Sequence, residues 1–221
     1  MVKMADKKQQ ITEVKIKAAS VASTKDRILD AALELFARKG FDAVSMREIA
    51  EEVGIQKSSL YSHFKSKDEI LDGIMEFPAT ELTLVGPKEE LDTLIDNLGL
   101  EGFMMMSNGV FRDWMKSQKM EKVWRVLCIE MYHNEKIQAF FSNFIDGAIS
   151  FWTLVFSKMA AKGMIKPLDP AVLANEYFGQ YIYLFIEYFL IKYDNTPGSF
   201  KRMAEKSIEG HMIFFVEALK K

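Results

Sequence analysis

TKDRILDAALELFARKGFDAVSMREIAEEVGIQKSSLYSHFKSKDEIL, residues 24–71, is the stretch that decides how this chain of 221 residues folds. Apolar residues recur in it three and four positions apart, which is the spacing of one buried helix face. Gly40 and Gly54 interrupt the pattern, because glycine readily takes the backbone conformation that ends a helix. The stretch therefore predicts three short helices and the start of a fourth.

Hydroxyl side chains mark where these helices begin. Ser23 or Thr24 suits the N-cap of the first helix. The runs Ser45-Met-Arg-Glu48 and Ser66-Lys-Asp-Glu69 have the pattern of a capping box and open the second and fourth helices. The second and third helices are joined by a short turn that contains a glycine, and this arrangement indicates a helix-turn-helix.

The third helix, residues 56–64, is predicted to have two different faces. Leu60 and Phe64 share a buried stripe, whereas the other positions carry hydroxyls, a tyrosine, a histidine and a lysine. Such residues form helices less readily than Glu, Lys or Ala, so a function other than helix formation is expected of them. Base edges and phosphates of DNA are groups that these side chains recognise. The candidate DNA contacts are Ser45, Lys57, Ser58, Ser59, Tyr61, Ser62, His63 and Lys67.

Each of four candidates also has a simpler interpretation. Ser45 can act as a helix cap alone, and Lys67 can be a solvated surface lysine. Tyr61 and His63 can pack against the neighbouring helices.

With its preceding helices, the segment GIQKSSLYSHFKSKDEIL resembles the DNA-binding domain of TetR-type (tetracycline-repressor-like) transcriptional regulators. About 48 residues carry the resemblance. Its landmarks are Ala31, Phe36, Gly40, Phe41, Ile49, Ala50, Gly54, Leu60, Tyr61, Phe64, Lys67 and Leu71. The chain has Gln56 where such proteins usually have a Ser or Thr cap, so the first residue of the third helix is left open. The resemblance implies a homodimer that binds double-stranded operator DNA.

Charge is distributed unevenly along the chain. Residues 1–67 carry 13 Lys and Arg against 9 Asp and Glu, and the remaining residues carry 16 against 22. A basic front part suits a domain that meets nucleic acid. The single Cys128 lies between apolar neighbours, which predicts a buried thiol and excludes a disulfide within the chain. The first residues lack the apolar run of a signal peptide, and we expect a cytoplasmic protein without a membrane span.

The remainder of the sequence predicts helices and no strands, so the fold class is all-α. Three domains are expected: an N-terminal extension at 1–22, either a flexible arm or an extra helix, a helix-turn-helix domain at 23–71, and a ligand-binding and dimerisation domain at 72–221. Pro78 and Gly86-Pro87 are expected to break or kink the fourth helix. Further helices are predicted at 88–106, 108–116, 119–133, 135–163, 170–193 and 199–219.

Methionine and aromatic residues are frequent in the middle helices, and such side chains form adaptable apolar linings. Simple filling of a helical core is the alternative for any one of them. As a group they favour a small apolar or aromatic effector. The candidate effector contacts are Met104, Asn108, Phe111, Trp114, Trp124, Met131, His133, Phe144, Trp152, Tyr177, Gln180 and Tyr181.

The last two predicted helices, 170–193 and 199–219, are expected to form the dimer interface. Apolar stripes on both helices and glycines at 179 and 210 favour close packing in a four-helix bundle across a two-fold axis. The candidate interface residues are Phe178, Ile182, Phe185, Phe189, Met203, Met212, Phe215 and Leu219.

These patterns predict a ligand-responsive DNA-binding regulator, in the first place a repressor released from a palindromic operator. Two alternatives remain open: a TetR-like protein without a small-molecule inducer that acts through protein partners, and a transcriptional activator. An enzyme is not expected, because the sequence has no phosphate-binding glycine loop and no histidine and cysteine cluster with metal-ligand spacing. No cofactor or metal is predicted.

Overall fold

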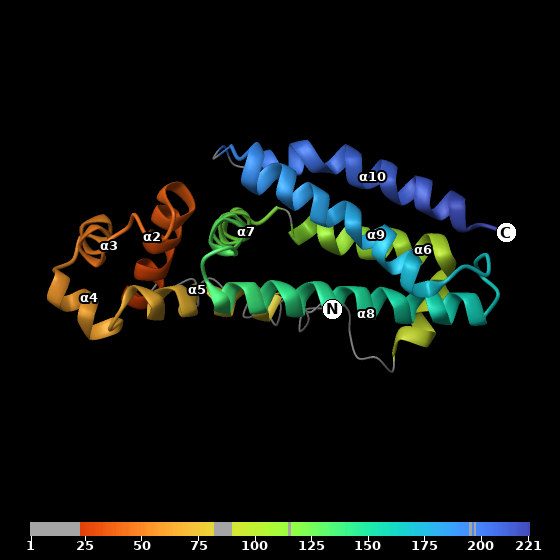
Figure 1. The fold of residues 1–221 in the computed structure, drawn as a ribbon, viewed down its shortest axis with the longest axis horizontal. Helices are drawn as coiled ribbons and strands as arrows, with labels where there is room; N and C mark the ends of the chain where they lie inside the picture. The colour runs from red at the N-terminus through yellow and green to blue at the C-terminus, as the bar shows by residue number, and fades with distance from the viewer. Residues whose placement is uncertain (1–22, 82–89, 115, 195, 197) are drawn as a thin grey trace, which may run out of the picture. The chain divides into compact units, whose positions relative to one another are not determined.

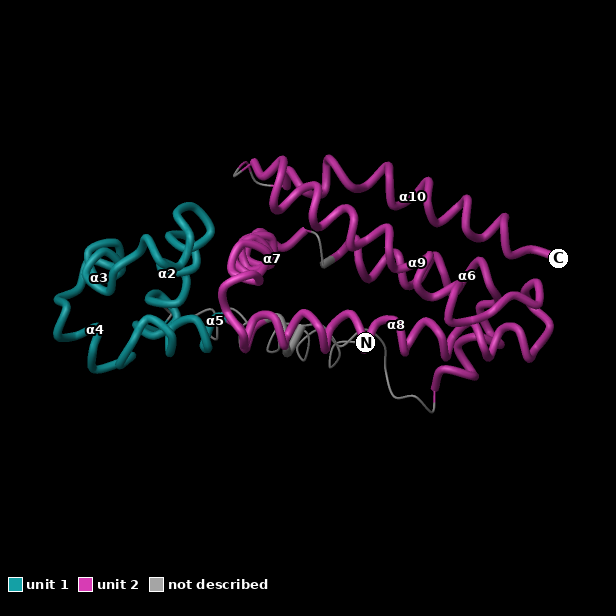
Figure 2. The backbone as a smooth tube through the Cα atoms, in the orientation of Figure 1, with its two compact units in different colours: residues 1–74 teal, residues 75–221 magenta. Residues whose placement is uncertain are grey.

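The computed structural model describes residues 23–81, 90–114, 116–194, 196 and 198–221, and these residues form helices and no strands. Figure 1 shows the helices in chain order from α2 to α10. The chain divides into two compact units, residues 1–74 and residues 75–221 (Figure 2). The predicted extension at 1–22 and the Gly86-Pro87 break lie outside the described residues.

The first unit contains α2 (Thr24–Lys39), α3 (Met46–Val53), α4 (Lys57–His63) and the beginning of α5 (Lys67–Glu81). Its core is built by the predicted apolar stripes. Fully or almost fully buried in it are Ile28, Ala32, Leu35, Phe36, Ile49, Ala50, Val53, Leu60, Phe64 and Leu71. The helix-turn-helix expected from the sequence is present as α3 and α4, with Gly54 between them at φ 75°.

The N-caps of this unit differ in detail from the predicted capping boxes. Ser45 accepts a hydrogen bond from the Glu48 amide at 3.2 Å, but the Glu48 carboxylate pairs with Lys39 and does not return to Ser45. A complete capping box occurs instead at the start of α2, where Ser23 and Asp26 satisfy each other's backbone amides. The predicted box at Ser45 was therefore half right.

The second unit contains the end of α5, α6 (Leu91–Trp114), α7 (Gln118–Glu130), α8 (Glu135–Ala161), α9 (Pro170–Phe185), a π-helical turn η2 (Ile186–Ile191) and α10 (Ser199–Leu219). Helix α9 packs on α8 and α10, and α6 packs on α8 and α10. Salt bridges from Lys158 to Asp92 and from Lys162 to Asp96 join the end of α8 to the beginning of α6.

Two predicted helix interruptions are corrected by the structure. Helix α5 continues through Pro78 to Glu81. The predicted break near Gly109 does not occur, and α6 is instead kinked at Gly99, whose φ of 63° is outside the helical region. A positive φ is strongly disfavoured for residues with a Cβ atom, which explains why the kink falls on a glycine.

Helix α8 is long and apolar enough to cross a bilayer by length and composition, and it is the only described helix with this property. Core helices of globular domains can share these features. One face of α8 contributes Phe141, Trp152 and Phe156 to the core, and its exposed positions include Ser142, Asn143, Asp146 and Ser150. This two-faced pattern is typical of a helix that packs on one side and meets water on the other.

The prediction for Cys128 is confirmed. The thiol is buried, and burial raises its pKa to about 12. Cys128 therefore stays protonated near neutral pH and behaves as a small apolar side chain.

Candidate functional site

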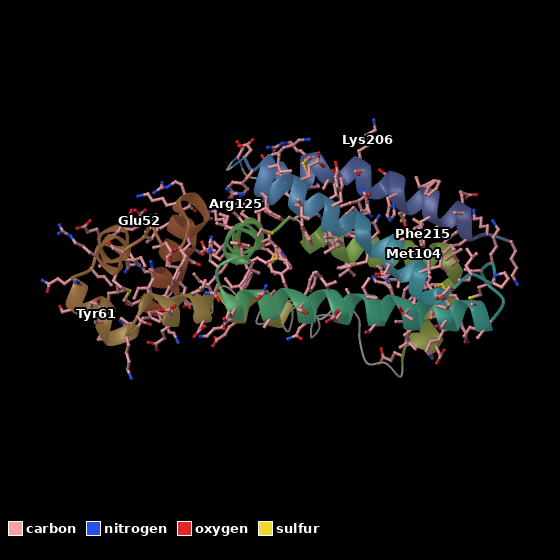
Figure 3. All side chains as sticks on the ribbon, in the orientation of Figure 1. Glu52, Tyr61, Met104, Arg125, Lys206 and Phe215 are labelled. Carbon is pink, nitrogen blue, oxygen red and sulfur yellow. The ribbon has the colours of Figure 1, made fainter. Side chains whose placement is uncertain are left out.

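Helix α4 presents a polar surface because Leu60 within it and Phe64 directly after it are buried in the core. Leu60 is fully buried and Phe64, directly after the helix, is 2% exposed. Lys57, Ser58 and Tyr61 are exposed on the other side. The two buried residues fix the rotation of this short helix, so these side chains face solvent (Tyr61 is labelled in Figure 3).

The structure resolves the question raised by Gln56. Gln56 is the N-cap of α4 without a side-chain capping bond, and the helix begins at Lys57. Lys57, Ser58 and Ser59 therefore form its first turn, where free backbone N–H groups also point outward. The Lys57 ammonium lies 5.6 Å from the centroid of the Tyr61 ring, one helical turn away.

The remaining candidate DNA contacts differ in how exposed their side chains are and in whether their polar groups already have partners within the protein. Ser45 is exposed at the start of α3, and His63 is exposed at the end of α4. Ser59 is half-buried. The Ser62 hydroxyl donates to the Ser59 carbonyl at 2.7 Å, so its proton is used within the helix.

Lys67 has a role that the sequence interpretation did not foresee. Its ammonium donates to the carbonyl oxygens of Phe41 at 2.6 Å and Val44 at 2.9 Å, and it lies 4.2 Å from the centre of the Phe41 ring. A third, longer contact joins it to the Asp42 carbonyl. Lys67 thus holds the turn between α2 and α3 against the start of α5, and it is neither a solvated surface lysine nor free to meet a phosphate in this arrangement.

The second unit contains a continuous network of aromatic rings that includes many of the candidate effector contacts. Tyr177 lies 4.4 Å from Trp152 and 5.5 Å from Tyr181, and Phe111 lies 4.8 Å from Tyr181 (centroid distances). Farther along, Trp124 lies 5.1 Å from Phe144. Phe178 and Phe185, which the sequence interpretation placed in the dimer interface, connect the two parts.

Polar groups occur within this network where α6, α9 and α10 meet. The Tyr177 and Tyr181 hydroxyls are 3.0 Å apart, and the Nε2 atom of His211 lies 3.1 Å from the Tyr177 carbonyl oxygen. Burial raises the pKa of both tyrosines and lowers the pKa of His211. Asn108 is 3% exposed, and its Nδ2 atom donates to the sulfur of Met212 at 3.4 Å. We call Asn108, Phe111, Tyr177, Tyr181, His211 and Met212 the α6–α9–α10 cluster.

Other candidate effector contacts are not members of this cluster. Met104, a residue of α6, is fully buried. Figure 3 labels both Met104 and Phe215, the latter on α10. Gln180 donates to the Ser207 hydroxyl at 2.9 Å and so links α9 to α10. Met131 is half-buried at the end of α7. The side chain of Trp114 lies outside the described part of the structure.

The prediction for His133 needs correction. His133 is exposed after α7, and its ring contacts Tyr132, which is itself 87% exposed. His133 and His211 also form no group with a carboxylate, since the described residues contain no cluster of three His, Cys, Asp or Glu side chains suited to a metal.

Five of the eight predicted interface residues are corrected by the structure, because they are buried within the protomer. These are Phe178, Phe185, Phe189, Phe215 and Leu219. Met212 is half-buried and contacts Asn108, while Ile182 and Met203 are half-buried. The stripe chosen from the sequence is thus mainly the face that packs on the protomer's own core.

A different apolar face of α9, η2 and α10 is exposed. It comprises Val172, Tyr183, Ile186, Leu190, Ile213 and Phe214, with exposed fractions from 42% to 71%. Gly179 and Gly210 are exposed on the same helices. We call these eight residues the exposed α9–α10 face. The positions 172, 179, 183, 186 and 190 repeat at intervals of three, four and seven, a pattern that is also visible in the sequence.

Comparison with known proteins identifies the domain that carries α4. Residues 28–74 match the family model described as "Bacterial regulatory proteins, tetR family". Residues 28–74 are thus a tetR-family domain. The match covers α3, α4 and the Lys67 contacts, so the polar surface of α4 is the helix-turn-helix surface of a tetR-family domain.

A curated relative is similar to this chain over the same domain. The Biofilm operon icaADBC HTH-type negative transcriptional regulator IcaR of Staphylococcus aureus is 48% identical over 48 residues, which are 22% of this chain and 26% of IcaR. The matches to the first curated relatives span 18% to 26% of their lengths. The similarity therefore concerns the DNA-binding domain.

Solved structures extend the likeness in fold to the second unit. NalD, described as the secondary repressor of the MexAB-OprM multidrug efflux pump in Pseudomonas aeruginosa, aligns with a TM-score of 0.61 at 17% identity, over 90% of this chain and 96% of NalD. A SmeT–triclosan complex aligns with a TM-score of 0.62 at 15% identity, over 90% of this chain and 93% of SmeT. This chain thus shares the fold of these proteins, with a helix-turn-helix domain and a helical C-terminal domain.

Proposed function

We propose that this chain is a cytoplasmic transcriptional repressor that binds a palindromic operator as a homodimer and releases it when a small aromatic molecule binds to the second unit. The observation that carries the proposal is the exposed polar face of α4, held by buried Leu60 and Phe64 in a tetR-family domain. Side chains of this kind hydrogen-bond to base edges and phosphates.

The proposed DNA contacts follow from the availability of each side chain. Ser58 and Tyr61 are assigned to base edges or adjacent phosphates. Lys57 neutralises a phosphate, and Ser45 and His63 donate to phosphates at the two ends of the surface. Each phosphate contact by a lysine steepens the salt dependence of binding by about 0.9 in the log–log slope.

Dimerisation is assigned to the exposed α9–α10 face. Exposed apolar residues that form a contiguous group usually mark an interaction surface. The spacing of three and four along α9 is the spacing by which helices pack in a bundle, and the exposed glycines permit close approach. A two-fold arrangement would place two copies of α4 in major grooves about 34 Å apart.

Repression and effector release are supported by relatives. IcaR is described as a negative transcriptional regulator and NalD as a repressor. The SmeT structure contains triclosan, a small aromatic molecule. In this chain the aromatic network of α6, α9 and α10 is the counterpart we propose. Helix α5, which runs from the first unit into the second, is the element that would transmit the change.

The experiment begins with selection of binding sites from a randomised DNA duplex pool by the purified full chain. We expect an enriched palindrome, whose affinity is then measured by fluorescence anisotropy with and without candidate aromatic molecules. A coupling of about 1–3 kcal/mol would weaken operator binding by about 5–150-fold. Enrichment of no sequence would refute the DNA-binding function. Tight operator binding that no ligand changes would support a regulator acting through protein partners, and transcription raised by the bound protein would show an activator.

A further inference from the structure

Asn108 is the polar residue of the α6–α9–α10 cluster whose hydrogen-bonding capacity is least satisfied. Its Nδ2 group faces the Met212 sulfur, while its Oδ1 atom accepts no hydrogen bond from any described residue. The orientation of the amide follows from chemistry, because a thioether sulfur accepts a hydrogen bond and has none to donate. A buried acceptor left in this state is destabilising, so native proteins normally provide it with a donor.

The other polar groups of the cluster are occupied. The hydroxyls of Tyr177 and Tyr181 hydrogen-bond to each other, and the His211 ring meets the Tyr177 carbonyl while stacking on the Tyr177 ring. Each of these groups has a partner of its own, and none of them donates to the Asn108 oxygen. A donor for this oxygen is therefore sought outside the described protein.

The surroundings of Asn108 favour an aromatic and uncharged molecule. Phe111 follows Asn108 by three positions on α6, and its ring contacts Tyr181, which in turn contacts Tyr177. No residue of the cluster carries a fixed charge, and burial lowers the pKa of its histidine, which keeps that ring neutral near pH 7. A carboxylate or an ammonium ion would lose its hydration here without gaining a counter-ion.

We propose that the effector is an uncharged aromatic molecule with an O–H or N–H donor, and that this donor binds to Oδ1 of Asn108 while the rings of Tyr177 and Tyr181 flank it. The inference rests on the proposed effector-dependent function, which it makes chemically specific. Asn108 is the group that distinguishes a phenol-like ligand from a hydrocarbon of the same shape.

The test compares three bicyclic probes by isothermal titration calorimetry with the full chain. The probe 2-naphthol offers an O–H donor, 2-methylnaphthalene has nearly the same shape without one, and 2-naphthoate carries a negative charge. Each probe is titrated into the wild type, into Asn108→Leu, and into the control Asn143→Leu, which changes an exposed asparagine of α8. Leucine has about the shape of asparagine and no acceptor.

We expect the wild type and Asn143→Leu to bind 2-naphthol and to bind 2-naphthoate weakly. The ratio of 2-naphthol affinity to 2-methylnaphthalene affinity should be about 5- to 100-fold higher in these proteins than in Asn108→Leu, as one buried hydrogen bond predicts. We also expect Asn108→Leu to unfold at no lower temperature than the wild type, because the substitution removes an unpaired buried acceptor. If Asn108→Leu does not fold, Asn108→Ala is measured in the same way.

Several results would overturn the inference. Equal ratios of 2-naphthol affinity to 2-methylnaphthalene affinity in the wild type and in Asn108→Leu would show that Asn108 contacts water or nothing. A wild type that binds none of the probes would contradict the proposed binding site. Operator binding is measured on the same samples, which separates the two proposals. A donor preference that depends on Asn108, together with operator affinity that 2-naphthol leaves unchanged, would uphold the binding site and refute effector-dependent release.

Discussion

Tyr61 and Leu60 are neighbours in α4 that face opposite ways. Tyr61 is 43% exposed, whereas Leu60 is fully buried. We expect Tyr61→Ala to weaken operator binding by about 1–3 kcal/mol, roughly 5- to 150-fold, while the melting temperature changes little. Anisotropy titration with the selected operator and a thermal melt measure the two quantities.

Leu60→Ala is the matched comparison for Tyr61. It removes a buried side chain and should lower the free energy of unfolding by about 2–5 kcal/mol. A comparable loss of stability in Tyr61→Ala would assign the tyrosine to packing and contradict its proposed DNA contact.

His211 gives the second unit a predictable pH dependence. The ring faces the Tyr177 carbonyl, the Tyr177 and Tyr181 rings and Phe215, and burial lowers its pKa from the ordinary value of 6.5. The unfolded chain therefore takes up this proton at higher pH than the folded chain does. Stability from the neutral ring is complete above about pH 6.5 and is lost as the pH falls from there toward the lower folded-state pKa.

The measurement is a series of thermal melts between pH 8 and pH 5 for the wild type and His211→Gln. We expect the melting temperature of the wild type to fall more steeply below pH 6.5 than that of the variant, because glutamine does not titrate. Parallel curves would show that His211 has the same pKa in the folded and unfolded chains.

At the scale of elements, Lys67 connects the start of α5 to the turn between α2 and α3. Lys67→Met keeps most of the aliphatic side chain and removes the hydrogen bonds to the Phe41 and Val44 carbonyls. We expect it to lower the free energy of unfolding by about 1–2 kcal/mol, measured by urea denaturation. Lys65→Met, at an exposed neighbouring position, should change stability by less than about 0.5 kcal/mol.

The same variant tests the role first expected of Lys67. If the ammonium contacts a phosphate, Lys67→Met should leave stability unchanged and reduce the log–log salt slope of operator binding by about 0.9. A change in stability with an unchanged slope would support the contact with the turn.

The sequence was most informative about helices that bury a single apolar face in one core. The predicted positions of α2 to α4, their buried stripes and the N-cap at Ser45 agree with the structure. These features depend on residues three or four apart, which periodicity detects. Lys67 shows the limit, because its carbonyl partners are more than 20 positions away and backbone oxygens have no sequence signature.

Periodicity was less informative for α9 and α10, which have apolar residues on two faces. A stripe at 178, 182, 185 and 189 and another at 179, 183, 186 and 190 both satisfy helical spacing. Spacing alone does not say which stripe packs within the protomer, and the denser aromatic stripe proved to be the internal one. The polar residues of the α6–α9–α10 cluster were partly predicted, since the sequence interpretation named Asn108, Tyr177 and Tyr181 and did not name His211.

At the scale of the whole molecule, two adjacent phenylalanines of α10 allow the proposed assembly to be tested. Phe214 is 71% exposed, while Phe215 is 6% exposed and lies 5.1 Å from Tyr177. We expect Phe214→Glu to convert the dimer into a folded monomer in sedimentation velocity, because it places a charge in the proposed interface. Operator affinity should fall about 100-fold or more, since two linked domains bind far more tightly than one.

Phe215→Ala is the comparison within the same turn of helix. It should destabilise the protomer by about 3–5 kcal/mol and leave the folded fraction dimeric. A dimer that survives Phe214→Glu would show that subunits associate through another surface.

The different orientations of Phe214 and Phe215 also limit how this helix can change during evolution. Each residue advances an α-helix by about 100°, so deletion of one residue early in α10 would exchange part of the internal face for part of the external face. Folding and assembly would then fail together. Insertions of a whole heptad would preserve both faces, and we expect homologous chains to differ in the length of this helix only by such steps or at its ends.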